Sequence, residues 1–343
     1  MSGNPRLRAH LDALIRSRGR IPFSEYMETV LYHPELGYYS SDRNPIGPGG
    51  DFYTSPNVDP AMGRLLARLF AEMAAGIDGF TVVELGAGTG LLARHVLESR
   101  AFPYVIVERS GAMRERQRRE LGDFGVEWSE AVPDGIRGCV FSNEFFDALP
   151  VRRFARRDGA VREIFVGEGL AEIEGEPDPP VELPLLGEGC VADVAPGAVD
   201  WVRRIGNAMI RGYHLAIDYG YVREDFFSHP RGTLMCYRRH VADEDPYQDP
   251  GEKDITAHVN FSDLIDAGRE VGLDLRGYRA QKDFLVDLGL LEIMRPLAGS
   301  RAASSVKRLQ ALKNLILPPM MGERFRVLLQ AKGVSSRELP GFR

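Results

Sequence analysis

The chain has 343 residues, 27% of them charged, and a formal net charge of -6 at pH 7. This balance argues against a broad nucleic-acid-binding surface. The apolar runs are far shorter than the roughly 20 residues that cross a membrane, and no apolar stretch follows the N-terminal arginines, so we expect neither a membrane span nor a secretory signal. The three widely spaced cysteines, Cys139, Cys190 and Cys236, predict reduced thiols in a bacterial-type cytoplasm, without a disulfide framework or a metal site.

Residues 1–75 are predicted to form an N-terminal cover of helices and loops. A helix is expected to begin near Pro22, and residues 65–73 carry apolar side chains at helical spacing. Between these helices, the stretch NPIGPGG at 44–50 indicates a loop, because glycine and proline interrupt regular structure.

From residue 80 the sequence alternates between short, mostly apolar strands and helices. This β-α-β rhythm predicts a parallel sheet that is covered by helices on both faces. The strands are predicted at 80–85, 104–108, 126–128 and 138–143, and the helices at 91–97 and 112–121.

Two insertions interrupt the rhythm, at about 151–197 and 221–259. The first is predicted to begin with a β-hairpin, because two strand-like runs flank Asp158-Gly159, a favoured two-residue turn. Helices at 198–210 and 260–271 and strands at 213–219, 273–280 and 324–332 complete the pattern. We therefore expect a Rossmann-like α/β domain over 76–333, with a mostly parallel seven-stranded sheet whose last strand is antiparallel, and a C-terminal tail at 334–343.

A glycine-rich turn, ELGAGTG at 84–90, follows the first strand of this sheet. Glycines let the backbone turn sharply and approach a ligand, and the N-terminus of the next helix attracts a carboxylate or phosphate. Glu108 ends the second strand, where an acid accepts hydrogen bonds from ribose hydroxyls in nucleotide sites of this architecture. Leu91 takes the place of the third glycine of the dinucleotide fingerprint, which disfavours NAD.

The stretch Asn143-Glu144-Phe145-Phe146 lies at the end of the fourth predicted strand, and Asp147 follows it. The carboxyl ends of parallel strands face the ligand crevice of a doubly wound sheet, so we expect this stretch beside the glycine turn. An amide and a carboxylate there can hold N–H groups, and the rings can exclude water. The alternative is that the rings belong to the core and Glu144 caps the next element.

The glycine pattern with its preceding acid resembles the cofactor loop of class I S-adenosylmethionine-dependent methyltransferases, and 143–146 resemble the polar-then-aromatic tetrad of members that methylate nitrogen. From about 22 to 332 the chain resembles the MidA family, the bacterial and mitochondrial methyltransferases linked to assembly of respiratory complex I. One departure is Ala61-Met62-Gly63, where an aromatic residue is expected before the glycine. The stretches that carry the resemblance are YM (26–27), LYHP (31–34), GYY (37–39), GDFYTSP (50–56), ELGAGTG (84–90), SNEFFDALP (142–150) and DITAHVNF (254–261).

The resemblance implies a class I methyltransferase fold, S-adenosylmethionine as the cofactor, and N-methylation of arginine on a protein, in mitochondria a subunit of complex I. A guanidinium keeps its proton in water, so two carboxylates would orient it through charge-assisted hydrogen bonds. The expected cofactor-binding residues are Glu84, Gly86, Ala87, Gly88, Gly90, Glu108, Asp51 and Thr54; the catalytic residues are Asn143, Glu144, Asp147 and His258; the substrate-binding residues are Phe145, Phe146, Asp218 and Tyr219.

Several of these residues also have ordinary structural interpretations. Asp51 is a loop residue, and Asp218-Tyr219 can belong to the core. His258 either accepts a proton after methyl transfer or has a satisfied structural role. Residues 243–254 carry six acids and one lysine, which forms either an acidic lip for an arginine-bearing peptide or a solvated loop.

Three alternatives to a protein arginine methyltransferase remain open. The same fold can methylate a small molecule or another protein side chain. A non-catalytic assembly factor can keep the fold as a scaffold, although an intact cofactor loop and Glu108 argue against this. An NAD-dependent enzyme is disfavoured by Leu91.

Overall fold

The computed structural model describes residues 3–40, 59–239, 241–317 and 321–343, and the chain divides into two compact units. Unit 1 comprises residues 1–52, 146–200 and 220–263, and unit 2 comprises residues 53–145, 201–219 and 264–343. Each unit therefore joins segments that are far apart in the sequence. The predicted domain boundaries at 75 and 333 stay predictions.

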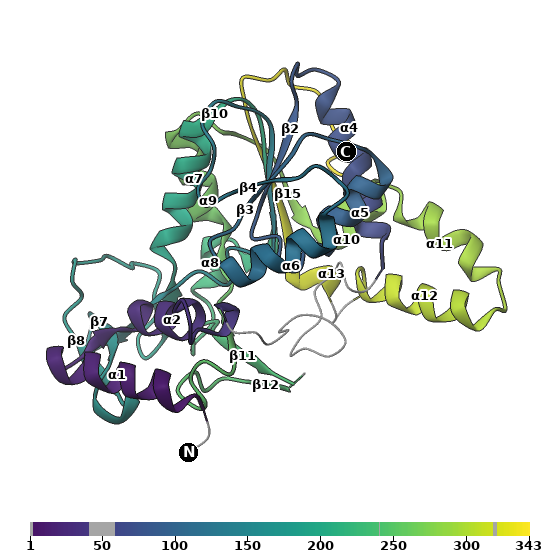
Figure 1. Ribbon diagram of the computed structural model, residues 1–343. Helices are drawn as coiled ribbons and strands as arrows, with labels where there is room; N and C mark the ends of the chain where they lie inside the picture. Colours follow the sequence, from purple (N-terminus) through teal and green to yellow (C-terminus); the bar gives the residue numbers. More distant parts are fainter. Residues whose placement is uncertain (1–2, 41–58, 240, 318–320) are drawn as a thin grey trace. The chain divides into compact units, whose positions relative to one another are not determined.

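The strands of unit 2 and the short strand β14 of unit 1 belong to one mixed sheet of eight strands (Figure 1). Along its main path the order is β15-β16-β10-β5-β2-β3-β4, and β14 pairs with the end of β10. The strands from β10 to β4 are parallel, whereas β16 is antiparallel to both of its neighbours. Their bounds are β2 (Thr81–Leu85), β3 (Tyr104–Val107), β4 (Glu127–Ser129), β5 (Ile136–Asn143), β10 (Met209–Tyr221), β14 (Val259–Asn260), β15 (Asp274–Ala280) and β16 (Phe325–Lys332).

The parallel part of the sheet is confirmed, and Asn260 caps α9 (Phe261–Glu270) as expected, because its side-chain oxygen accepts the Ser262 N–H at 3.2 Å. Two details of the prediction are wrong: the number of strands and the position of Ile210. The Asn260 backbone also pairs with β10, and this short strand raises the expected seven strands to eight. Ile210, expected in a helix, lies instead in β10, because pairing with β5 begins at Met209.

Helices cover both faces of this sheet, as the alternating pattern predicts. Figure 1 shows α7 (Pro196–Ala208) and α9 on one face, and α4 (Ala61–Ala74) and α5 (Leu91–Ser99) on the other. Gly63 lets α4 and α5 approach closely, since a Cβ there would lie only 2.4 Å from the Cβ of His95. Met62 beside it is fully buried, so an apolar side chain fills the position where an aromatic residue is expected.

Four helices between β15 and β16 were not predicted. Pro296 and Gly299 interrupt the helical pattern there, and most apolar side chains of α11 are only partly buried, so the periodic signal is weak. No helix in the described part of the chain is long and apolar enough to cross a membrane. The four helices are α10 (Gln281–Asp287), α11 (Leu290–Ala298), α12 (Ala303–Asn314) and α13 (Met321–Arg324).

Unit 1 contains two antiparallel sheets. The larger has the order β1-β7-β6-β9, with β8 beside β7, and the smaller has the order β12-β11-β13. The predicted hairpin is confirmed: Asp158 and Gly159, with φ of 50° and 77°, join β6 to β7. The elements of unit 1 are α1 (Pro5–Arg18), α2 (Phe23–Tyr32), α8 (Arg223–Phe226), β1 (Ile21–Pro22), β6 (Arg152–Arg157), β7 (Ala160–Val166), β8 (Glu172–Gly175), β9 (Val191–Val194), β11 (Met235–Arg238), β12 (Val241–Asp243) and β13 (Asp254–Thr256).

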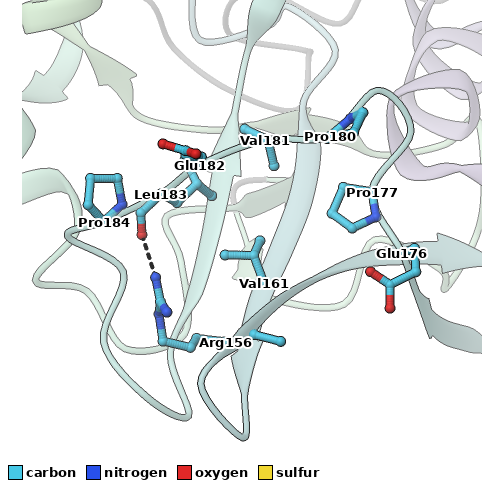
Figure 2. Close-up of a pocket in the computed structure, with 10 residues that line it drawn as sticks. Arg156, Val161, Glu176, Pro177, Pro180, Val181, Glu182, Leu183 and Pro184 are labelled. Carbon is cyan, nitrogen blue, oxygen red and sulfur yellow. Dashed lines mark hydrogen bonds between the residues drawn. The ribbon is translucent and has the colours of Figure 1, made fainter.

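The proline-rich segment after β8 is fastened to this hairpin. Arg156 donates hydrogen bonds to the carbonyl oxygens of Leu183 and Leu186 at 2.8 and 2.6 Å, and Figure 2 shows the first of these bonds. A hollow of about 570 Å³ lies between the segment and the hairpin, lined by Val161, Val181 and three prolines among other residues. The Arg156 guanidinium is thus used to hold the loop.

A buried carboxylate in β9 is predicted to support unit 1. Asp193 accepts the backbone N–H groups of Thr233 and Leu234 at 2.6 and 3.0 Å and pairs with Arg153 at 3.1 Å. Asp193→Ala should lower the free energy of unfolding by about 3–5 kcal/mol, because it leaves a buried cation and two donors without this acceptor.

The matched control is Glu174→Ala, which removes a partly exposed ion pair with Arg157 in the same sheet. Its cost should stay below about 1 kcal/mol. Equal losses for both variants in urea unfolding followed by circular dichroism would contradict the assignment.

Candidate active site

The glycine turn has the backbone conformation that its sequence predicts. Gly86, Gly88 and Gly90 have φ of 60°, 53° and 87°, in the left-handed region that favours glycine. The Gly90 N–H donates to the Ala87 carbonyl at 2.8 Å, and α5 begins at the next residue. The first N–H groups of a helix have no partner inside it, so the start of α5 can accept a carboxylate.

Glu84, at the end of β2, is only 2% exposed. The Tyr104 hydroxyl donates to its Oε2 atom at 2.6 Å. Burial raises the pKa of the Glu84 carboxyl to about 7, and the Tyr104 bond opposes this rise. The carboxyl therefore changes charge near neutral pH.

Glu108, directly after β3, is held on both of its oxygens. Oε1 accepts the Ser110 N–H at 2.8 Å, and Oε2 accepts the side-chain amide of Gln117 at 3.3 Å. Burial raises the pKa of Glu108, and these two hydrogen bonds act in the opposite direction. A carboxylate has about four acceptor positions, so the group retains capacity for ligand hydroxyls.

Asn143 and Glu144 form a polar pair at the carboxyl end of β5. The Asn143 Nδ2 group donates to Glu144 Oε1 at 2.8 Å. Because an ionised carboxylate only accepts, this bond fixes the amide orientation and turns Oδ1 the other way. Oδ1 of Asn143 is buried and has no hydrogen-bond partner among the described residues. A buried acceptor of this kind is suited to an N–H group of a ligand.

Phe145 joins the polar pair to the glycine turn. A Cβ on Gly86 would lie 2.7 Å from the Cδ2 atom of Phe145, so the ring packs directly on the glycine backbone. On another side, Phe145 makes an edge contact with Trp201 of α7, with ring centroids 5.1 Å apart. The expected neighbourhood of these two turns is therefore present in unit 2.

Asp218 holds the Asn143–Phe145 turn. It is fully buried, and its carboxylate accepts the N–H groups of Phe145 at 3.1 Å and Tyr219 at 2.9 Å. Glu144 adopts a φ of 54°, which is uncommon outside glycine, and its N–H donates to the Ile217 carbonyl at 3.0 Å. The Tyr219 ring packs against Phe325 at a tilt of 41°, with centroids 3.8 Å apart. Substrate contacts of Asp218 and Tyr219 stay predictions.

The remaining expected site residues belong to unit 1 or lie outside the described residues. Asp51 and Thr54 lie outside them. Phe146 and Asp147 are buried, and the Asp147 carbonyl accepts the Ala257 N–H at 2.9 Å, which brings the neighbour of His258 beside Asp147. The His258 N–H donates to Thr233 Oγ1 at 3.1 Å, and its ring lies near Tyr221 and His229.

The acidic segment 243–254 is extensively paired within unit 1. The Lys253 ammonium binds the Asp243 carboxylate at 2.7 Å, and the Arg238 guanidinium binds both Asp249 and Glu252. Arg231 pairs with Glu244 at 3.1 Å. These three cations pair with four of the six acids that the sequence suggested for an acidic lip.

Three residues of the site in unit 2 were missed by the sequence analysis: Tyr104, Gln117 and Trp201. Gln117 had a readable signal, because it lies four residues from both Met113 and Leu121, which face the core. A polar residue on the buried stripe of a helix needs hydrogen-bond partners. Tyr104 and Trp201 carry no such signal, since their partners come from distant segments.

A parallel sheet with a glycine turn after β2, and with the hydrogen-bonded carboxylate of Glu108 after β3, defines an α/β enzyme with a nucleoside-cofactor site. Residues 61–279 match the profile of a family of S-adenosyl-L-methionine-dependent methyltransferases, and the chain belongs to this family. The resemblance drawn from the sequence is confirmed, and the protein is an S-adenosylmethionine-dependent methyltransferase.

Relatives along the full chain agree with this assignment. The chain is 30% identical to the mitochondrial protein arginine methyltransferase NDUFAF7 of Homo sapiens, over 94% of this chain and 82% of that protein. A mitochondrial homologue from Drosophila melanogaster is 28% identical over 98% of this chain and 87% of its own. A Burkholderia thailandensis protein, crystallised with S-adenosyl-homocysteine, is 35% identical with a TM-score of 0.90, over 98% of this chain and 94% of that one.

The buried Glu84 carboxyl predicts a pH-dependent stability of the cofactor-free protein. A folded pKa raised from 4.5 to about 7 stabilises the fold below pH 4.5, and this contribution is lost as the pH rises towards 7. Glu84→Gln, which keeps the acceptor for Tyr104 and has no charge, should match the wild type near pH 4. It should be more stable by about 3 kcal/mol at pH 8, at roughly 1.4 kcal/mol per pKa unit.

Urea unfolding of both proteins from pH 4 to pH 8 measures this difference directly. Parallel stability curves would show that Glu84 has an ordinary pKa. Other titrating groups, such as the buried His214, cancel in the comparison because both proteins contain them.

Proposed function

We propose that this enzyme methylates an arginine nitrogen of a protein at the site between the glycine turn and Asn143-Glu144-Phe145 in unit 2. The contact of Gly86 with Phe145 carries the proposal, because it puts the cofactor turn beside a polar-aromatic pair. One further feature fits a bound acceptor: Asn143 Oδ1 is buried and has no hydrogen-bond partner among the described residues.

The residues of the turn and of the strand ends would bind different parts of the cofactor. We assign the methionine end to Gly86, Ala87, Gly88 and Gly90 and the start of α5, and the ribose hydroxyls to Glu108. Glu84 supports the turn from its buried position and can pair with a cationic amino group. When bound, S-adenosylmethionine supplies an activated methyl group to a nucleophile placed behind it.

Asn143 and Glu144 would position the acceptor. A guanidinium has N–H donors in a plane, and it is not readily deprotonated because its pKa exceeds about 12. Asn143 Oδ1 and the Glu144 carboxylate can accept two of these donors, which leaves a third nitrogen as the nucleophile. Phe145, fixed by Gly86 and Trp201, would exclude water and stack on the planar group.

The identity of the acceptor follows from chemistry and from the names of the relatives. Relatives at 28–30% identity are named protein arginine methyltransferases. The N–H groups of a guanidinium need hydrogen-bond acceptors, and the Asn143-Glu144 pair provides them. On the MidA resemblance we propose a subunit of respiratory complex I or a related protein as substrate, in a bacterial cytoplasm. Proton removal by His258 and orientation of the guanidinium by Asp147 stay predictions.

Gly88→Val should abolish cofactor binding while the sheet remains folded. A β-branched residue at φ of 53° is strained, so the substitution would distort the turn to which we assign the cofactor. Calorimetric titration with S-adenosyl-homocysteine measures the loss, and circular dichroism monitors the fold. Unchanged affinity in a folded variant would refute the placement of the cofactor.

Glu144→Gln should reduce methyl transfer about a hundredfold while affinity for S-adenosyl-homocysteine changes little. Glutamine keeps an acceptor for the Asn143 amide but loses the charge that orients a guanidinium. Turnover at the wild-type rate would exclude Glu144 from acceptor binding.

The arginine assignment is tested with a lysate from cells that lack the enzyme. Purified enzyme and S-adenosylmethionine with a labelled methyl group should label a protein band, and acid hydrolysis should release methylarginine. Label in another amino acid or in a small molecule would refute the substrate class. Cofactor binding without any labelled product would favour the non-catalytic scaffold.

A further inference from the structure

Gln117 is a fully buried polar residue in α6 (Gly111–Leu121), and no function has so far been attached to it. It lies between Met113 and Leu121 on the face of the helix that packs against the sheet. Burying an amide without partners costs free energy, so its hydrogen bonds must be accounted for. All of its partners lie in unit 2, in three different elements.

The orientation of the Gln117 amide is determined by Trp128 in β4. The indole Nε1–H donates to Gln117 Oε1 at 3.0 Å. An indole nitrogen is a donor only, so the atom that it meets must be the amide oxygen. The NH2 group of Gln117 therefore faces the opposite direction, towards the cofactor turn.

That NH2 group connects the two elements of the cofactor site. It donates to the Gly88 carbonyl at 2.9 Å and to Glu108 Oε2 at 3.3 Å. The Gly88 carbonyl belongs to the turn assigned to the methionine end, and Glu108 is the acid assigned to the ribose. One amide group thus binds both halves of the site at the same time.

We infer that Gln117 is a positioning residue of the cofactor site, which holds the Glu108 carboxylate and the Gly88 turn in the mutual arrangement that S-adenosylmethionine requires. This inference rests on the proposed placement of the cofactor. Ser110 N–H fixes Oε1 of Glu108 and Gln117 fixes Oε2, so the carboxylate cannot rotate, and its remaining acceptor positions face the ligand in one arrangement. Because the carboxylate is already ordered, less conformational entropy is lost when the ribose hydroxyls bind to it.

The residue type is specific to this task. A glutamate would present a carboxylate to the Gly88 carbonyl and to Glu108, both of which are acceptors. A methionine of similar length would fill the space but donate nothing. Trp128 acts indirectly, because its hydrogen bond to Oε1 only fixes the orientation of the Gln117 side-chain amide.

The test uses two ligands, S-adenosyl-homocysteine and its 2′-deoxyribose analogue, titrated calorimetrically into the protein. The ratio of the two dissociation constants measures how much the ribose hydroxyl contributes. Glu108→Gln should bring this ratio close to one. Gln117→Met should lower the affinity for S-adenosyl-homocysteine about tenfold. It should also move the ratio of dissociation constants most of the way to the Glu108→Gln value, because the Glu108 carboxylate is no longer oriented.

Two further variants separate positioning from general destabilisation. Trp128→Phe keeps both amide donors of Gln117 but frees their orientation, so it should lower the ratio by a smaller amount. Gln281→Met is the matched control: Gln281 is also fully buried in unit 2, where it donates to the Leu315 carbonyl, and it lies after β15 at the far edge of the sheet. Its ratio should equal that of the wild type.

The outcomes distinguish this inference from the proposed cofactor placement. A wild-type ratio in both Gln117→Met and Trp128→Phe, together with a lost ratio in Glu108→Gln, would overturn the role of Gln117 and leave the placement intact. A wild-type ratio in Glu108→Gln would overturn the placement of the ribose and this inference with it. An equal loss in Gln281→Met would show a general effect of destabilisation and would also overturn the inference.

Discussion

The close packing of the Phe145 ring on the Gly86 backbone is the constraint on which the site depends. A side chain at residue 86 would occupy the position of the ring, so the contact requires glycine for space as well as for its φ of 60°. The same contact brings the end of β5 to the turn after β2, two neighbouring parallel strands. Asn143 and Glu144 consequently lie next to the turn to which we assign the reactive end of the cofactor.

Around this contact, buried polar groups hold each part of the site in place. Asp218 holds the turn that carries Glu144, Tyr104 holds Glu84, and Gln117 holds Glu108. Methyl transfer depends chiefly on the placement of the acceptor atom behind the methyl group, so rigid support is a direct contribution to catalysis. These supporting residues are largely covered from solvent, which strengthens their hydrogen bonds with charged groups.

Much of the fold in unit 2 was predictable because local signals agree with each other there. Apolar strands, glycines at 86, 88 and 90, and the Asp158-Gly159 turn of unit 1 each specify a backbone conformation within a few residues. Asn143, Glu144 and Phe145 could be placed because strand ends meet at one edge of a parallel sheet. Trp201 escaped prediction because its partner Phe145 lies far away in the sequence. Gln117 carried a readable signal on the buried stripe of its helix, and the helices between β15 and β16 gave only a weak periodic pattern. The pairing of the acidic segment by Arg238 and Lys253 was likewise a property of folded contacts rather than of composition.

On the proposed placement, the glycine turn aims the reactive carbon of the cofactor at Asn143 and Glu144. The most direct measurement is a crystal structure with sinefungin, a cofactor analogue that carries an amine where the transferable methyl group would be. This amine should lie within about 3 Å of Asn143 Oδ1 or of the Glu144 carboxylate, at hydrogen-bonding distance. An amine directed away from both residues, with the nucleoside seated elsewhere on the sheet, would contradict it.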